Sequence, residues 1–223
     1  AQTQRSLVNF SIGEILIPIK LIHALALIKE AAAKVNNRLG VLEKDKSDFI
    51  IQAAQEIKEG KHNKQFPLSI WQTGSGTHTN MNLNEVISNI VSKDNDQPLG
   101  SHKLVHPNDH VNKSQSTNDV FPSAIHIATI KAIKDKLLPE TALLIKTFSQ
   151  KSKDWKSIVK IGRTHLQDAV PITLGQEVSA WEAQLDMACN RIQNSLEELY
   201  YLPLGGTAVG TGINSPLMFD IEI

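Results

Sequence analysis

Two long stretches with helical spacing of their apolar residues constrain the fold of this chain most strongly. Residues 119–153 carry apolar side chains along one helical face, and residues 173–202 repeat the pattern. Each stretch is longer than the roughly 10–14 residues of an average helix. Helices of this length usually pack in bundles that bury their apolar stripes. Pro139 should kink or divide the first, whereas Thr173 should cap the second and Pro203 should follow its end.

Three shorter helices are predicted in the first half of the chain. Residues 19–39 have helical apolar spacing and are followed by Gly40, a residue type that often ends helices. The second helix should begin with a cap at Asp45 or Ser47, and the third should begin near residues 80–82.

No stretch alternates apolar and polar residues strongly enough to predict a sheet. We therefore predict an all-α fold. An N-terminal helical domain should cover residues 1–116, and the first long helices of a bundle should occupy residues 117–223. Residues 92–113 are rich in Asp, Asn, Pro, Gly and His, which predicts a long loop of the kind that is often functional.

Composition narrows the classes of partner. The 23 Lys and Arg residues balance the 23 Asp and Glu residues, so nothing favours a nucleic acid or a membrane surface as partner. No apolar run reaches the roughly 18 residues expected of a membrane span. Cys189 is the single cysteine, which excludes an internal disulfide and predicts a reducing compartment. No metal-ligand spacing occurs among the histidines, and we expect no metal and no cofactor.

Four polar blocks interrupt the helical pattern and concentrate hydroxyl, amide and imidazole groups at predicted loop-to-helix junctions. They are residues 74–80 (GSGTHTN), 106–109 (HPND), 115–119 (QSTND) and 162–168 (GRTHLQD). Helix starts present free N–H donors and favour anions, and these side chains add neutral donors. The blocks therefore predict a small polar ligand rather than a polymer.

Each block also has an ordinary structural explanation. Residues 74–80 and 115–119 could be helix caps, although consecutive Ser, Thr and Asn exceed what one cap needs. Residues 106–109 could equally form a turn. His165 could be an acid or base that titrates near neutral pH, or a surface imidazole without a chemical role.

These blocks and several further segments, in the same order along almost the whole chain, resemble the class II fumarate hydratases of the fumarase/aspartase superfamily. The similar segments are residues 1–6 (AQTQRS), 71–77 (WQTGSGT), 80–82 (NMN), 84–86 (NEV), 105–109 (VHPND), 114–119 (SQSTND), 160–168 (KIGRTHLQD) and 205–212 (GGTAVGTG).

The resemblance implies reversible hydration of fumarate to L-malate, an anti addition of water through an aci-carboxylate intermediate in the tricarboxylic acid cycle. It implies a cytoplasmic enzyme, or one of the mitochondrial matrix if the source is eukaryotic. It also implies a homotetramer with a shared core of long helices and active sites formed by three subunits. His165 would act on water, and the substrate would bind Ser75, Thr77, Ser116, Thr117, Asn118 and Thr164. A second dicarboxylate site would comprise His106, Asn108 and Asp109.

Departures from the family pattern leave alternatives. The family's Gly-Ser-Ser-x-Met-Pro-Gly-Lys-x-Asn loop, which supplies the serine assigned as the base, does not occur in this sequence. We therefore expect roughly the first half of a fumarase, inactive by itself. Thr117 stands where many fumarases have a second serine, whereas related ammonia-lyases carry the same Ser-Thr-Asn as this chain. An aspartate ammonia-lyase and a non-catalytic helical oligomerisation fragment remain the alternatives.

Overall fold

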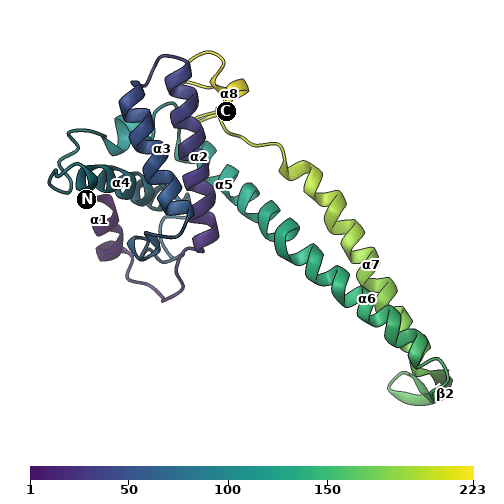
Figure 1. The fold of residues 1–223 in the computed structure, drawn as a ribbon. Coiled ribbons are helices and arrows are strands. Elements are labelled where there is room, and N and C mark those ends of the chain that lie inside the picture. Colours follow the sequence, from purple (N-terminus) through teal and green to yellow (C-terminus); the bar gives the residue numbers. More distant parts are fainter. The chain divides into compact units, whose positions relative to one another are not determined.

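The computed structural model describes all 223 residues, which form two compact units (Figure 1). The first unit comprises Ala1–Ala128 together with Leu202–Ile223, and the second comprises Thr129–Tyr201. The predicted domain boundary at residue 116 stays a prediction. The all-α prediction is confirmed, because helices make up both units apart from one small hairpin.

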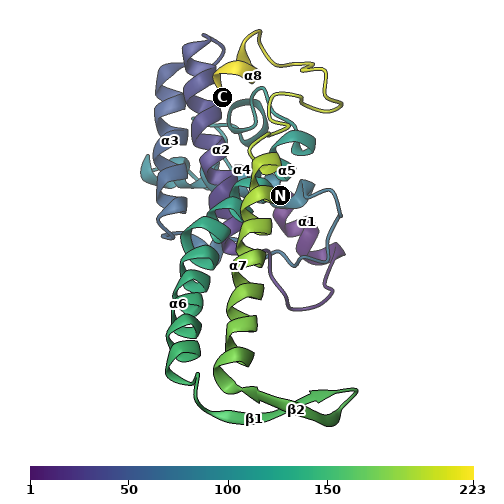
Figure 2. The same cartoon turned by 90° about the vertical axis from the view of Figure 1, so that its right-hand side faces the viewer.

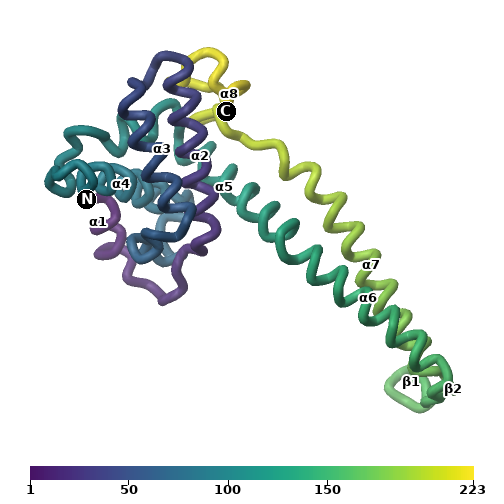
Figure 3. Tube along the Cα trace, viewed as in Figure 1, coloured from purple at the N-terminus to yellow at the C-terminus, as the bar shows by residue number.

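Three helices that were predicted from apolar spacing form the core of the first unit. They are α2 (Ile19–Arg38), α3 (Lys44–Lys58) and α4 (Thr77–Asp94). In Figure 3, α2 and α3 run side by side through this unit, and both chain termini lie in it. Buried leucine, isoleucine, valine and alanine side chains fill the space between the helices. The short helices α1 (Gln2–Asn9), η1 (Asn63–Gln65) and α8 (Phe219–Glu222) complete it.

The ends of these helices correct part of the sequence interpretation. Gly40 follows α2 with a φ of +74°, as a helix-ending residue should. The predicted cap of α3 is wrong, because Glu43 is its N-cap and the Ser47 hydroxyl donates to the carbonyl oxygen of Ala33 at 3.0 Å. The hydroxyl thus crosslinks α3 to α2. The helix α4 begins at Thr77, earlier than predicted, directly after Gly76.

The loop predicted over residues 92–113 contains more structure than expected. The helix α4 continues to Asp94, and η2 (Pro107–Val111) forms one turn of π-helix. Pro107 stands in the first turn of η2, where its missing N–H group has no partner to lose. Val105 and Val111 are buried and tie this segment to the core, so its backbone is fixed by packing.

The first of the two long predicted helices is divided. It comprises α5 (Thr117–Ala132), a π-helical turn η3 (Ile133–Leu137) and α6 (Leu138–Asp154). Pro139 lies in the first turn of α6, so the predicted division at this proline is confirmed. Pro122 lies inside α5, but only in its second turn, where few helical hydrogen bonds are affected.

In the second unit, α6 and α7 (Leu174–Leu199) run side by side and a β-hairpin joins them (Figure 2). Thr173 caps α7, as predicted, and forms a capping box with Gln176. The rings of Phe148 on α6 and Trp181 on α7 lie 6.0 Å apart between the helices. Most of the apolar stripe is nevertheless accessible within this unit; Leu143, for example, is 62% exposed.

The hairpin was missed by the sequence interpretation. Its strands are β1 (Val159–Thr164) and β2 (Gln167–Thr173), which pair antiparallel. Thr164 pairs with Gln167, so His165 and Leu166 alone form the turn, and both have positive φ angles of 50° and 62°. Two-residue turns of this kind usually contain Asn and Gly, which is why a His-Leu turn gives no hairpin signal.

Glu30 on α2 gives the first unit a predicted dependence on pH. Burial by itself would raise the pKa of Glu30, but hydrogen bonds from Lys34, Lys58 and Gln55 outweigh burial and lower that pKa from 4.5 to about 2. A carboxyl group whose pKa is lower in the folded state stabilises the fold above the unfolded pKa. This contribution should therefore be present above about pH 5 and be lost as the pH falls towards 2.

The variant Glu30→Gln should lower the free energy of unfolding at pH 7 by about 1–3 kcal/mol, because three donors lose their charged acceptor. The difference from wild type should shrink steadily as the pH falls from 5 to 2, in acid unfolding followed by circular dichroism. Glu59→Gln is the matched control, since Glu59 pairs with Lys61 on the solvent-exposed surface. If Glu30→Gln and Glu59→Gln lowered the free energy of unfolding equally and at every pH, the hydrogen bonds to Glu30 would not be the source of the pH dependence.

Candidate functional site

The start of α4 presents two of the predicted substrate residues. The hydroxyl groups of Ser75 and Thr77 lie 3.0 Å apart and are both exposed, next to the open N–H groups of the first helical turn. Gly76 between them has a φ of +73°, and a Cβ atom there would lie 2.4 Å from the ring of Phe121. Only glycine meets both conditions, so the turn holds the two hydroxyls at the positive end of an 18-residue helix.

The start of α5 presents three further predicted substrate residues. The Ser116 hydroxyl accepts the backbone N–H of Asn118 at 3.2 Å, and the Asn118 amide donates to the carbonyl oxygen of Ala208 at 3.0 Å. The Thr117 hydroxyl accepts the side-chain amide of Asn80 at 3.0 Å. Asn80 belongs to α4, so this bond connects the starts of the two helices.

The buried side chain of Asp119 holds the start of α5 in place. From the sequence, only a capping role was predicted for this residue. Its carboxylate is 1% exposed and accepts the backbone N–H groups of Ser116 at 3.0 Å, Gly205 at 3.2 Å and Thr207 at 2.8 Å. The side chain thereby joins two segments that the sequence separates widely. Its membership of the polar block 115–119 was the available signal.

Lys29 also lies beneath this segment, and no sequence pattern pointed to it. The side chain is fully buried, and Nζ donates to Asn112 Oδ1 and to Gln115 Oε1, each at 3.0 Å. Burial lowers the pKa of Lys29 from 10.5 to about 7, while the nearby carboxylate of Asp119 opposes that shift. In the sequence Lys29 looks like an ordinary polar position of an amphipathic helix.

The predicted second dicarboxylate residues surround the start of η2. His106 Nδ1 lies 3.3 Å from the backbone N of Asn108 and 3.1 Å from that of Asp109 and accepts both. It also lies 3.2 Å from Asp109 Oδ2, but one nitrogen cannot accept these bonds and carry the proton of an ion pair. The backbone bonds identify His106 as the cap of η2. The backbone N–H of His106 donates to Nδ1 of His110, whose pKa is lowered by burial and by the nearby Lys46.

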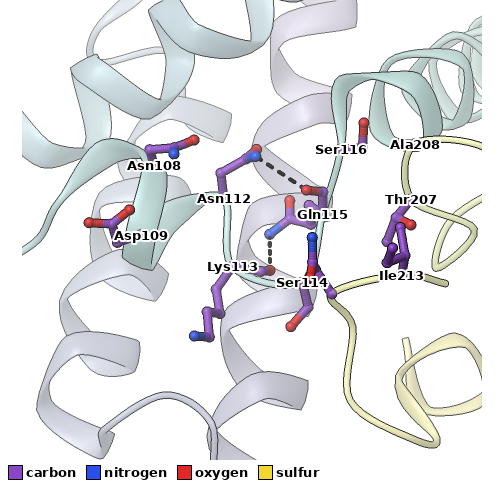
Figure 4. A pocket seen from close by; sticks show the side chains of 11 residues that line it. Asn108, Asp109, Asn112, Lys113, Ser114, Gln115, Ser116, Thr207, Ala208 and Ile213 are labelled. Carbon is purple, nitrogen blue, oxygen red and sulfur yellow. Dashed lines mark hydrogen bonds between the residues drawn. The ribbon is translucent and has the colours of Figure 1, made fainter.

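One cavity of about 520 Å³ connects these two parts of the first unit (Figure 4). Asn108 and Asp109 line one part of it, and Ser116 and Thr207 line another. Polar side chains of residues 112–115 separate them, with Asn112 hydrogen-bonded to the Gln115 carbonyl oxygen. The first unit therefore brings part of the predicted second site and one predicted substrate residue to the same hollow.

Thr164 and His165 belong to the second unit. Thr164 ends β1, and His165 is the first residue of the hairpin turn; both side chains are exposed. Arg163 and Asp168 pair across the hairpin with Nε and Oδ1 3.2 Å apart. The hairpin and the start of α7 line a cavity of about 670 Å³ that includes Thr164. These two residues are thus presented at an accessible β-turn rather than at a helix start, contrary to our expectation.

Two further findings concern membrane-spanning helices and metal-binding groups. None of the helices combines the length and the apolar character needed to span a membrane. No three side chains of His, Cys, Asp or Glu are grouped so that they could hold a metal ion.

Comparison with known proteins decides the family. A sequence model described as a lyase matches residues 1–222. The chain belongs to this lyase family, within the fumarase/aspartase superfamily. This membership confirms the resemblance inferred from the polar blocks.

Two similar curated proteins are class II fumarate hydratases. The class II fumarate hydratase of Prochlorococcus marinus strain MIT 9313 is 65% identical over 222 residues, covering 100% of this chain and 48% of that protein. That of Photorhabdus laumondii is 55% identical with the same coverage. The crystal structure of class II fumarase from Schistosoma mansoni matches with a TM-score of 0.93 and 46% identity, over 100% of this chain and 47% of that one. The chain thus spans about half the length of the curated relatives it matches.

Proposed function

We propose that this chain contributes to an enzyme that reversibly hydrates fumarate to L-malate. The observation that carries the proposal is the joining of two helix starts by the Asn80–Thr117 hydrogen bond, which gathers neutral donors around one place. Neutral donors and helix N-termini bind a carboxylate without the strong attraction to polyanions that a basic patch would create. The names of relatives up to 65% identical support fumarate as the substrate.

The chemistry requires stabilisation of negative charge. Removal of a proton next to a carboxylate of malate produces an aci-carboxylate, in which that carboxylate carries an additional negative charge. Donors that are already oriented stabilise such charge without reorganising during the reaction. The hydroxyls of Ser75, Thr77, Ser116 and Thr117, with the Asn118 amide, are the donors that we assign to the substrate carboxylates.

The second unit would supply the groups that act on water. Thr164 would bind substrate, and His165 would activate water or protonate the departing hydroxide, as suits an imidazole near neutral pH. The exposed place of His165 in the hairpin turn supports this role, because its imidazole is accessible to a substrate held by another subunit. His106, Asn108 and Asp109 would form a second dicarboxylate site near the entrance of the active site.

Assembly is part of the proposal. The exposed apolar side chains of α6 and α7, such as Leu143 and Met187, support burial against other copies of the chain in a homotetramer. Active sites formed by three subunits would then combine the two helix starts with His165 of another subunit. We place the enzyme in the cytoplasm, or in the mitochondrial matrix of a eukaryote, and its reaction in the tricarboxylic acid cycle.

Assays of the complete protein test the function directly. We expect it to hydrate fumarate, measured by the loss of ultraviolet absorbance, and to release no ammonia from L-aspartate. Ammonia release without hydration would favour the aspartate ammonia-lyase. Neither activity in a correctly assembled protein would favour the non-catalytic oligomerisation fragment. The names of the relatives favour neither alternative.

A further inference from the structure

Lys29 has no part in the proposed chemistry, yet it is fully buried and hydrogen-bonded to the segment that leads into α5. Its ammonium form can only donate hydrogen bonds, and its neutral amine form, which prevails above the pKa of about 7, still has two hydrogens for the same two acceptors, the side-chain oxygens of Asn112 and Gln115. Each of these amides must therefore turn its oxygen towards Lys29 and its NH₂ group away from it. The Gln115 amide accordingly donates to the carbonyl oxygens of Val111 and Lys113.

The orientation of Asn112 determines that of Asn80. Asn112 Oδ1 accepts the Asn80 Nδ2 group at 3.1 Å in addition to Lys29. The second hydrogen of that Asn80 group is donated to Thr117 Oγ1 at 3.0 Å. Because the Thr117 oxygen accepts this bond, the hydrogen of its own hydroxyl remains available for another acceptor.

This orientation is unfavourable for the Asn80 amide itself. Its side-chain oxygen is buried without any hydrogen-bond partner. Leaving a buried acceptor unsatisfied is unfavourable by about 1–3 kcal/mol. If the amide were reversed, Asn80 Oδ1 could accept the Thr117 hydroxyl hydrogen and the site would lose a donor. Asn112 Oδ1 faces three donors, from Lys29, Asn80 and Asn84, and Asn112 Nδ2 donates to the Gln115 carbonyl oxygen. Of the three donors only Lys29 has no amide oxygen that could take the place of its donor by rotation.

We propose that Lys29 is a positioning residue that acts through Asn112 and Asn80 to make the Thr117 hydroxyl a donor towards a dicarboxylate ligand. The inference deepens the proposed function and rests on its assignment of Thr117 to substrate binding. The proposed role of Lys29 differs from simple support of residues 112–115, because a second, uncharged side chain of α2 also holds this segment in place. Asn36, also on α2, donates to the Lys113 carbonyl oxygen at 2.9 Å and accepts the Ser114 hydroxyl.

The experiment compares kcat and KM for malate in the complete protein. Lys29→Met should raise KM about tenfold and change kcat less than threefold, because the Thr117 hydroxyl contacts the carboxylate that is not converted to the aci form, so that substrate and transition state lose this donor alike. Lys29→Arg keeps a donor-only cation and should restore KM to within about threefold of wild type. In a Thr117→Val background, Lys29→Met should raise KM less than twofold further, since both changes remove the same donor.

Asn36→Leu is the matched control, because it loosens residues 113 and 114 without removing the cation; its KM should stay within about twofold of wild type. An unchanged KM in Lys29→Met, additive effects with Thr117→Val, or an equal defect in Asn36→Leu would each overturn the proposal. If Lys29→Met does not assemble, Asn112→Leu breaks the same connection and should show the same dependence on Thr117.

Titration calorimetry with succinate separates this inference from the proposed function. If the wild type binds succinate but does not hydrate fumarate, the proposed function fails. The ratio of each variant's Kd for succinate to that of the wild type then replaces the KM ratio and still tests the role of Lys29. A wild type that binds no succinate would overturn both.

Discussion

His165→Asn should lower the turnover of malate by about 10²–10⁴-fold in the complete protein, the usual loss when an acid–base group is removed. KM should change far less, because Thr77 and the donors at the start of α5 remain to bind the carboxylates. The reason is chemical: hydroxide is a poor leaving group, and its departure from malate needs a proton. Steady-state kinetics with malate, together with isothermal titration of succinate, measure the two effects separately.

The choice of asparagine follows from the backbone. His165 has a φ of 50°, a conformation that asparagine tolerates better than most residues, so the two-residue turn should keep its shape. His62→Asn is the control, since His62 pairs with Glu56 outside the four polar blocks. A wild-type rate in His165→Asn would exclude the assigned role. Equal losses in both variants would indicate a general effect of histidine removal on stability.

The residue at position 165 also distinguishes a fumarate hydratase from an aspartate ammonia-lyase. Ammonia can leave already protonated, so an ammonia-lyase has less need of an acid there, and aspartases typically have Gly-Arg-Thr-Gln where this chain has Gly-Arg-Thr-His. His165→Gln therefore tests whether the imidazole or merely a hydrogen-bonding side chain is required. For a hydratase we expect a loss similar to that of His165→Asn.

Apolar periodicity predicted the helices because burial of one helical face is the main source of their stability. It could not predict the hairpin. Its turn has two residues, His165 and Leu166, that are unusual at positive φ, and its strand β2 is exposed and carries Pro171. Nor could it locate the cap of α3, since Ser47 bonds to Ala33 of the preceding helix, a tertiary contact.

The exposed donors of the candidate site were accessible to sequence reasoning, because runs of Ser, Thr and Asn before a helix exceed what capping requires. The groups beneath them were not. Lys29 lies in the middle of a regular helix, and Asn80 serves a hydroxyl 37 positions away. Only the folded arrangement shows the hydrogen bonds that join Lys29, Asn112 and Asn80, and this is why candidate donors could be predicted from the sequence but the side-chain network beneath them could not.

The second large effect is expected for Asp119→Asn. An ionised carboxylate that accepts three backbone N–H groups is a strong acceptor, and charge-assisted bonds of this kind contribute about 1.5–3 kcal/mol each. Asparagine has the same shape but offers one oxygen, and its NH₂ group would face an N–H donor. The free energy of local opening at Gly205 and Thr207 should therefore fall by about 2–4 kcal/mol, measured by native-state hydrogen exchange of their amides.

Asp48→Asn is the control for the loss of one negative charge, because Asp48 pairs with Lys44 on the surface of α3 and should leave that protection unchanged. The loosening caused by Asp119→Asn should also reach the donors at the start of α5, because the Ser116 N–H group is held by the same carboxylate. Succinate binding should accordingly weaken in Asp119→Asn and stay the same in Asp48→Asn. Unchanged exchange at Gly205 and Thr207 in Asp119→Asn would show that the carboxylate does not hold the two segments together.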